Sequence, residues 1–258
     1  MKKLLLILFT SLLCSEQLDI QYIGNASFVL SDGKKNLFID FPYEVGAYGF
    51  AMDYSLDSII TGDNNISIIT HHHGDHWWRK GFMDSNNKLF APYFVRLFVP
   101  KSRKILFKEH TVIDDLIINP IKTPHGFTIA PFGFNINLKC ISHYSYIFFW
   151  HNKKIFISGD ANSEYELLQR EKNIDIAIIT YWNGEYALMN NKNIDAKDII
   201  LCHFFNLEQI PQYRESIEKE KIYTLFGDNT NIHVLDQYEH LYINISNYPH
   251  IDFPSLSR

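Results

Sequence analysis

Short apolar runs separated by turn residues dominate the first part of the chain. Leu18–Ile23 ends in a Gly-Asn pair, and Ala26–Leu30 is followed by a polar turn at residues 31–36. Leu37–Ile39 forms a third run, and Ile66–Thr70 forms a fourth after an irregular stretch. Runs of this length bounded by Gly, Asn and Asp are typical of β-strands. The pattern predicts a meander of short strands.

Strand signals continue along the chain and then begin to alternate with helix signals. A short helix is expected from Trp77 onward, and Ser163 followed by Glu166 predicts a helix over residues 163–172. An amphipathic pattern interrupted by Pro211 predicts another over residues 207–219. Strands first and strand–helix alternation later suit two packed sheets with helices outside, an α/β sandwich. The further predicted strands are residues 104–107, 111–116, 117–122, 134–141, 146–150, 154–158, 174–180, 198–201 and 222–226.

Composition allows a sizeable core and argues against one class of partner. The chain has 258 residues, of which 46% are hydrophobic, and no linker divides it. Residues 18–258 are therefore predicted to form a single domain. The formal net charge is −5, and we find no basic stripe, so the sequence carries no strong nucleic-acid signal. The oligomeric state stays open.

The N-terminus predicts export. Lys2 and Lys3 precede an almost wholly apolar run from Leu4 to Leu13, the layout of a secretory signal peptide over residues 1–17. The alternative is a buried first strand or helix, which two lysines at the start disfavour. We expect a periplasmic or secreted protein, tethered to a membrane only if Cys14 is lipidated, although its preceding residues match a lipoprotein signal poorly. A disulfide between Cys140 and Cys202 is permitted there but not predicted.

The segment after the fourth run carries the most informative motif. Residues 70–76 read Thr-His-His-His-Gly-Asp-His, which contains His71-x-His73-x-Asp75-His76. Imidazole and carboxylate side chains suit Zn²⁺ and, less selectively, Mn²⁺ or Fe. A histidine run can also be a surface tract or a tag, but this one is internal and follows a strand. We predict a metal site on the loop where that strand ends.

Three later residues are candidates for further ligands, since a site with two metal ions needs more than the first motif supplies. His125 precedes Gly126, Asp160 follows a predicted strand in a Gly-Asp pair, and His203 ends another. Each has an ordinary alternative: a turn histidine, a helix-capping aspartate and a core histidine, respectively. Their joint order favours the ligand reading. The remaining histidines show no such pattern, with His143 and His233 kept as possible pocket residues.

With these residues in view, the chain resembles the metallo-β-lactamase superfamily. The first motif matches the signature of that superfamily, and His125, Asp160 and His203 match its later ligands in order. Residues 22–28 and Leu37–Asp40 also resemble its opening strands. The resemblance covers about residues 18–226. It implies an αββα four-layer sandwich of two mixed β-sheets with outer helices.

The resemblance also implies how the ligands divide between two divalent cations, with zinc expected and manganese or iron as alternatives. Asp160 would bridge the two ions, Asp75 would also orient the attacking water, and Asp40 would support the ligand loop. The ligands of one ion would be His71, His73 and His125, and those of the other Asp75, His76 and His203.

Within the superfamily, the likeness is greater to the branch of ascorbate-6-phosphate lactonase and N-acyl-phosphatidylethanolamine phospholipase D. Zinc β-lactamases generally have Cys or Ser where Asp160 stands. The implied function is hydrolysis of an ester, lactone or amide in a small or lipid-like molecule by activated water. A phosphodiesterase is the alternative, and a non-catalytic metal-binding protein is disfavoured by the complete ligand set. The sequence Trp77-Trp78-Arg79 departs from the superfamily, so pocket shape and substrate stay open. Trp77, Trp78 and residues 181–183 are pocket candidates or plain packing.

Overall fold

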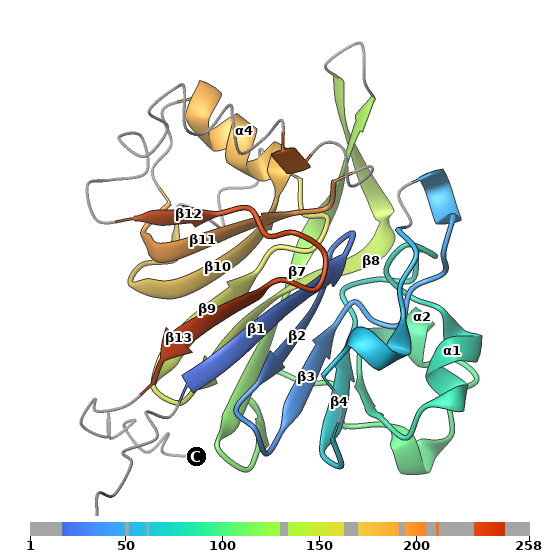
Figure 1. Ribbon diagram of the computed structural model, residues 1–258. Helices are drawn as coiled ribbons and strands as arrows, with labels where there is room; N and C mark the ends of the chain where they lie inside the picture. The colour runs from blue at the N-terminus through green and yellow to red at the C-terminus, as the bar shows by residue number, and fades with distance from the viewer. Residues whose placement is uncertain are drawn as a thin grey trace, which may run out of the picture.

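The computed structural model describes residues 17–49, 52–60, 62–129, 134–162, 170–190, 194–204, 210–211 and 230–245. Two mixed β-sheets form the body of the protein (Figure 1). In the six-stranded sheet, β4 runs parallel to both β3 and β5, whereas β13, β1, β2 and β3 pair antiparallel. Its strands, in order across the sheet, are β13 (His240–Asn244), β1 (Gln17–Gly24), β2 (Ser27–Ser31), β3 (Asn36–Ile39), β4 (Asn65–Ile68) and β5 (Lys88–Phe90).

The seven-stranded sheet joins a parallel half to an antiparallel half. Strands β9 to β12 run parallel, and β6 to β9 pair antiparallel. The near-continuous apolar run of β10 is buried along most of its length, as expected of a parallel strand covered on both faces. The order is β12 (Asn231–His233), β11 (Ala196–Cys202), β10 (Ile174–Thr180), β9 (Lys153–Ile157), β8 (Phe134–Trp150), β7 (Leu116–Ile129) and β6 (Thr111–Ile113).

The main core lies between the two sheets, and side-chain alternation decides which residues reach it. Phe28 and Leu30 of β2 belong to this core, together with residues of the other sheet such as Phe148 and Ile178. Val29, between them in sequence, faces the opposite side and packs in a separate cluster with Tyr43. Because successive side chains of a strand point to opposite faces, the six-stranded sheet is apolar on both sides.

Short helices cover the outer faces. Figure 1 shows α1 (Arg79–Asp84) and α2 (Tyr93–Arg96) beside the six-stranded sheet and α4 (Tyr181–Met189) beside the seven-stranded sheet. Three single 3₁₀ turns complete the described helices: η1 (Ala47–Gly49), η2 (Leu56–Ser58) and η3 (Lys101–Arg103). Among the described residues, no helix has both the length and the apolar character to span a bilayer.

The predicted α/β sandwich of two mixed sheets is confirmed, with local corrections. The helix expected from Trp77 begins at Arg79. Residues 104–107 form no strand; a single bridge joins Lys104 to Leu89, and Ile105 and Phe107 pack against the core. The separate strands predicted over residues 134–141 and 146–150 are one long strand, β8.

Several predictions fall mainly outside the described residues. They are the helices over 163–172 and 207–219, the strand over 222–226, and the signal peptide over 1–17, of which only Gln17, the first residue of β1, is described. These stay predictions, as does the single domain over 18–258. Cys202 is buried and is not in a disulfide.

Candidate metal centre

The histidine motif follows β4 on a loop whose start is held by a buried carboxylate. The backbone N–H of Thr70 donates to Asp40 Oδ1 at 2.7 Å, and the Thr70 hydroxyl donates to Asp40 Oδ2 at 2.8 Å. Asp40 Oδ2 also lies 2.8 Å from His76 Nδ1. Because an ionised carboxylate only accepts hydrogen bonds, this contact keeps a proton on Nδ1. In the neutral ring, the lone pair of His76 Nε2 therefore faces the centre.

His125 reaches the centre from β7, where strand pairing is interrupted. The register between β7 and β8 shifts between Thr123 and His125. The backbone N–H of Gly126 then donates to the carbonyl oxygen of Asp160 at 2.7 Å. A Cβ on Gly126 would lie only 2.7 Å from the Cα of Asn162. Glycine at this position lets β7 approach the loop that carries Asp160.

Asp160 and His203 lie just beyond the carboxyl ends of β9 and β11, two strands of the parallel half of the sheet. Parallel strands place these ends at one edge of the sheet, where ligands of open α/β sheets bind. Gly159 has a φ of +51°, and a Cβ there would lie 2.6 Å from His143 Nε2. The backbone N–H of His203 donates to the carbonyl oxygen of Asn25 at 2.6 Å, which ties this edge to the other sheet.

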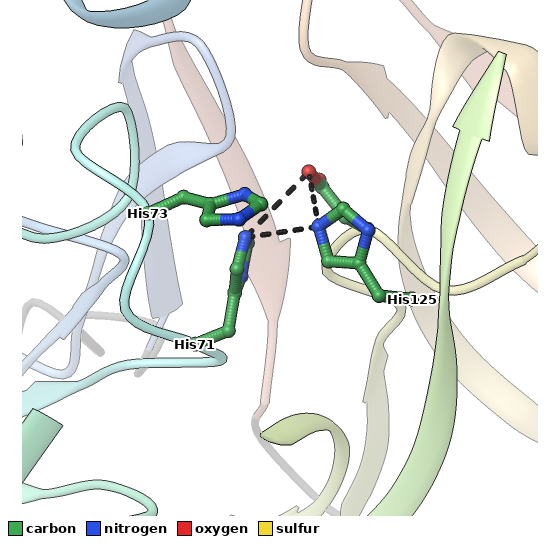
Figure 2. Close-up of side chains that lie close together, drawn as sticks. His71, His73 and His125 are labelled. Atoms are coloured by element: carbon green, nitrogen blue, oxygen red, sulfur yellow. Dashed lines mark hydrogen bonds and ion pairs between the residues drawn. The ribbon is translucent and has the colours of Figure 1, made fainter. Parts of the chain in front are cut away.

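The structure brings all seven predicted ligands together in two groups that share one carboxylate. Within each group, one ligand atom of each residue lies within 4.8 Å of the others. Figure 2 shows the rings of His71, His73 and His125 facing one another across a small space. These groups are the two that the superfamily resemblance implies. The first is His71, His73, His125 and Asp160, and the second is Asp75, His76, Asp160 and His203.

Asp160 lies between the two groups. Its Oδ2 atom is 3.2 Å from His76 Nε2 and 3.5 Å from His125 Nε2, and its Oδ1 atom is 3.3 Å from His203 Nε2. Two pairs of imidazole nitrogens also approach closely: His76 Nε2 to His203 Nε2 at 2.9 Å, and His71 Nε2 to His125 Nε2 at 3.2 Å. The lone pairs of neutral imidazoles repel at such distances unless a proton or another cation lies between them.

Burial and neighbouring charges set the protonation of these side chains. Burial lowers the pKa of His71 well below its usual value and lowers the pKa of His73 to about 4. Burial would also lower the pKa of His76, but nearby carboxylates, Asp160 foremost, raise it well above the usual value. Burial would raise the pKa of Asp160, but His76 and His203 hold it well below the ordinary carboxyl range. The carboxylates of the site thus favour a positive charge among them.

Two further histidines, His72 and His143, lie near the ligand groups but belong to neither of them. His72 is exposed and belongs to neither group, as the sequence pattern predicts. His143 is fully buried, with its ring centroid 5.2 Å from that of His71 and 5.6 Å from that of His125. Its Nδ1 atom lies 2.7 Å from Thr123 Oγ1. Its place follows from the β7–β8 pairing, which puts it opposite Thr123, and no local sequence signal reveals that register.

An open pocket of about 440 Å³ adjoins the histidine loop. Trp77, which the sequence left open between pocket and packing, lines this pocket and also packs against Phe82 with ring centroids 5.2 Å apart. The ring of Trp182 lies 4.9 Å from that of His203. Asn183, another pocket candidate, instead donates to Thr180 Oγ1 within the fold. The pocket is lined by Glu44, Val45, Gly46, Ala47, Tyr48, His72, Gly74 and Trp77.

The similarity of this chain to known proteins was found among solved structures. No protein-family model matches it, and no curated protein matches it in sequence. Igni18, a metallo hydrolase from the archaeon Ignicoccus hospitalis KIN4/I, is similar with a TM-score of 0.62 and 14% identity, covering 88% of this chain and 98% of that one. The metallo-β-lactamase fold protein YhfI from Bacillus subtilis is similar with a TM-score of 0.56 and 12% identity, covering 88% and 99%.

A further similar structure belongs to a protein that is not described as a hydrolase. CmlA, a diiron β-hydroxylase from Streptomyces venezuelae, is similar with a TM-score of 0.55 and 9% identity, covering 88% of this chain and 54% of that one. Likenesses at such low identity show the fold, and the predicted metallo-β-lactamase fold is confirmed. They leave the branch, the metal and the reaction to be argued from the site.

Proposed function

We propose that this chain, which has the metallo-β-lactamase fold, is a hydrolase that uses two divalent metal ions, with zinc expected. The observation that carries the proposal is the pair of ligand groups that share Asp160. Their residues come from both sheets and meet at one edge of the sandwich. Nitrogen and carboxylate oxygen donors in this mixture suit zinc and also suit manganese and iron.

The unpaired atoms of the site fit bound cations. Asp75 Oδ1 and Asp160 Oδ1 are buried and have no hydrogen-bond partner among the described residues. Buried carboxylates are costly unless they are paired or bind metals. No Lys or Arg of the described chain lies within ion-pair distance of either one. Bound divalent ions would supply what the site lacks.

Divalent ions in the two groups would supply Lewis acidity, lowering the pKa of a water molecule and polarising the substrate oxygen. The protein contributes orientation. Asp40 fixes His76, and the glycine at 126 lets His125 approach Asp160. Asp75 Oδ1 accepts no hydrogen bond from the described chain, so it is placed to accept one from the attacking water. Asp75 is therefore proposed both to bind metal and to orient the nucleophile.

We propose that a substrate entering through the pocket beside the histidine loop is uncharged. Its lining contains no Lys or Arg, and Glu44 is its one acidic residue. A phosphodiester anion would meet that carboxylate without a compensating side-chain cation, whereas an ester, lactone or amide would not be repelled. We therefore place neutral carbonyl substrates ahead of phosphodiesters.

Metal analysis and a substrate panel test the proposal together. Purified protein loaded with zinc should hold about two ions per chain, and His73→Ala and His76→Ala should each lower the content toward one or less. Chromogenic esters, lactones and phosphodiesters then separate the reaction classes. The matched control is His72→Ala, which removes an exposed imidazole from the same loop.

Three results would contradict the proposal in different ways. Metal content well below one ion in replete conditions, unchanged by His73→Ala, would remove the metal centre itself. Full metal content without turnover of any substrate class would leave a non-catalytic metal-binding protein. Turnover of phosphodiesters alone would replace the carbonyl reading by the phosphodiesterase alternative.

A further inference from the structure

One stretch of the chain carries a charge opposite to that of the whole. Residues 79–108 hold eight Lys and Arg residues and one Asp, a net charge of +7, whereas the complete chain carries −5. Among the described residues, none of these eight cations forms a salt bridge. Their positive charge is therefore not neutralised within the fold. The exposed members are Arg79, Lys80, Lys88, Lys101 and Lys108.

The same stretch exposes large apolar side chains. The exposed fractions are 69% for Tyr93 and 53% for Phe94, both on α2, 79% for Phe98 and 62% for Leu106. Phe98 has a φ of +60°, a conformation that bulky residues rarely adopt, and its ring stands in solvent with the Arg79 guanidinium 5.8 Å from its centroid. Grouped exposed apolar side chains mark interaction sites in soluble proteins.

A packed layer supports this surface from below. Phe82, Leu89 and Val95 are buried in one cluster beneath α1 and α2. Arg103 donates from Nη2 to the carbonyl oxygen of Phe82 at 2.9 Å and from Nε to that of Asn87 at 3.0 Å. The exposed side chains thus project from a fixed base, which lowers the entropy lost on binding.

We propose that the exposed residues of 79–108, here called the basic–aromatic surface, dock on a bilayer that contains anionic lipids. The unpaired cations complement anionic headgroups, and the Phe and Leu side chains can enter the boundary of the acyl region. Single-stranded nucleic acids are bound in grooves lined by stacking rings. Here the exposed apolar groups include the aliphatic side chain of Leu106, which offers no stacking ring, and this favours the bilayer.

The surface adjoins the pocket beside the histidine loop. The ring of Phe94 lies 5.9 Å from that of His72, which lines the pocket. Figure 1 shows α1 and α2 together at one side of the molecule, away from β10 to β12. Docking would therefore turn the pocket toward the lipid surface. The docking proposal stands on charge and exposure alone and does not depend on the proposed hydrolysis.

Vesicle binding of the complete, metal-loaded chain tests the proposal. The probes are vesicles of phosphatidylcholine alone and of phosphatidylcholine with an equal part of phosphatidylglycerol. We expect binding at least about tenfold tighter to the anionic vesicles, lost at high salt because counterions screen the attraction. The combined variant Lys80→Glu, Lys101→Glu and Lys108→Glu should bind them at least about a hundredfold more weakly, since each lysine near the surface contributes about fivefold.

Two further variants make the result specific. The control combines Lys34→Glu, Lys122→Glu and Lys172→Glu, three exposed lysines outside residues 79–108, and makes the same change in net charge. It should weaken binding by less than about threefold. Phe94→Ser with Phe98→Ser should weaken binding about tenfold and leave its salt dependence in place. The N-terminal residues are the same in all variants, so their contribution cancels.

Three outcomes would overturn the proposal. The first is equal binding to the two kinds of vesicle by the unaltered chain. The second is an equal loss in the two lysine variants, which would mean that net charge alone matters. The third is unchanged vesicle binding with loss of binding to a single-stranded oligonucleotide, which would assign the surface to nucleic acid. Because the altered side chains are exposed, melting temperatures within about 2 °C will confirm that each variant folds.

Discussion

Two clusters of His and Asp side chains lie at opposite ends of β3, and they differ in what balances their carboxylates. The strand leads at its end into Asp40 and the metal centre. At its start, Lys35 Nζ lies 2.7 Å from Asp115 Oδ1, and His151 Nε2 lies 2.8 Å from Asp32 Oδ2. Asp32, Asp115 and His151 are close enough together to hold a metal ion, as the metal-centre ligands are. Proximity of donor atoms therefore does not separate the two clusters.

The difference lies in the cation that the chain itself supplies. In the cluster at the start of β3, the buried ammonium of Lys35 contacts the Asp115 carboxylate, and Asp32 Oδ1 accepts hydrogen bonds from the backbone N–H groups of Lys34 and Lys35. In the metal centre, no lysine or arginine of the described chain takes this part, and Asp75 and Asp160 each keep a buried oxygen without a hydrogen bond. A candidate metal site is thus recognised by its missing positive charge more than by its donor atoms.

The largest expected effect comes from the shared carboxylate. Asp160→Asn should lower zinc content from about two ions to one or less and reduce turnover more than about 100-fold, because the amide carries no charge to bridge two ions. Elemental analysis and the activity assay measure both effects. Asp115→Asn is the matched change in the Lys35 cluster and should alter neither. A loss of zinc in Asp115→Asn would break the comparison.

Removal of metal by a chelator should have the second largest effect, a loss of thermal stability. A ligand that binds only the folded protein stabilises it by about 4 kcal/mol when the free ligand concentration is a thousand times the dissociation constant. For a domain of this size, that corresponds to a fall of about 10 °C in melting temperature. Thermal denaturation with and without the chelator measures it. The shift should be the same in Lys35→Met, and its disappearance there would mean that the second cluster holds the ion.

Lys35→Met should destabilise the fold by about 1–2 kcal/mol without changing metal content, because it removes the cation beside Asp115. Burial would lower the pKa of Lys35, but hydrogen bonds to Asp115 and Asp114 raise it above 10.5. Burial would raise the pKa of Asp115, but the hydrogen bond from Lys35 lowers it below 3.8. Urea denaturation at a series of pH values measures the penalty.

The pH range over which this penalty applies follows from the raised pKa of Lys35 and the lowered pKa of Asp115. The Lys35 contribution is complete below the ordinary lysine pKa and is lost as the pH rises through the raised folded value. The Asp115 contribution is complete above the ordinary carboxyl pKa and is lost as the pH falls through the lowered folded value. The penalty of Lys35→Met should therefore be flat from about pH 5 to 9 and shrink in stronger acid. A penalty that changes across neutral pH would argue against this ion pair.

The smallest expected effect is that of His72→Ala. This side chain offers the same imidazole as its neighbours but stands in solvent. Its removal should change stability by less than about 0.5 kcal/mol and leave zinc content unchanged. Because His72 lines the pocket, a moderate change in KM is compatible with its position. Loss of an ion in this variant would show that burial does not select the ligands.

The strands and the ligand loops could be predicted from sequence because each depends on local order. Apolar runs such as Ile174–Thr180 coincide with a buried strand, and His71 to His76 follow another. Short or weakly patterned elements were missed, among them β5, β13 and α4. The prediction of a strand over residues 104–107 was wrong because the apolar run reflects the packing of Ile105 and Phe107 against the core, whereas strand pairing depends on the edge of β5, which is distant in sequence.

Two other features could not be predicted from sequence in this way: one depends on strand register and the other on the charge of one segment of the chain. The burial of His143 beside the ligands follows from the register of two long strands, which local sequence does not contain. The net charge of −5 also concealed the basic stretch at residues 79–108, because acidic residues elsewhere outweigh it. Charge summed over a window of one or two elements would have shown this stretch.

The sharing of ligands between the two sheets has a consequence for assembly. His76 and His203 lie 127 residues apart in sequence, on loops of different sheets, and their Nε2 atoms approach to 2.9 Å. An ion held between them acts as a cross-link that closes a long loop, and covalent closure of a loop of about 100 residues is worth roughly 5 kcal/mol. Such a link forms only once most of the chain has folded. Metal uptake would therefore report the completed tertiary structure, and its rate in refolding experiments would time the docking of one sheet on the other.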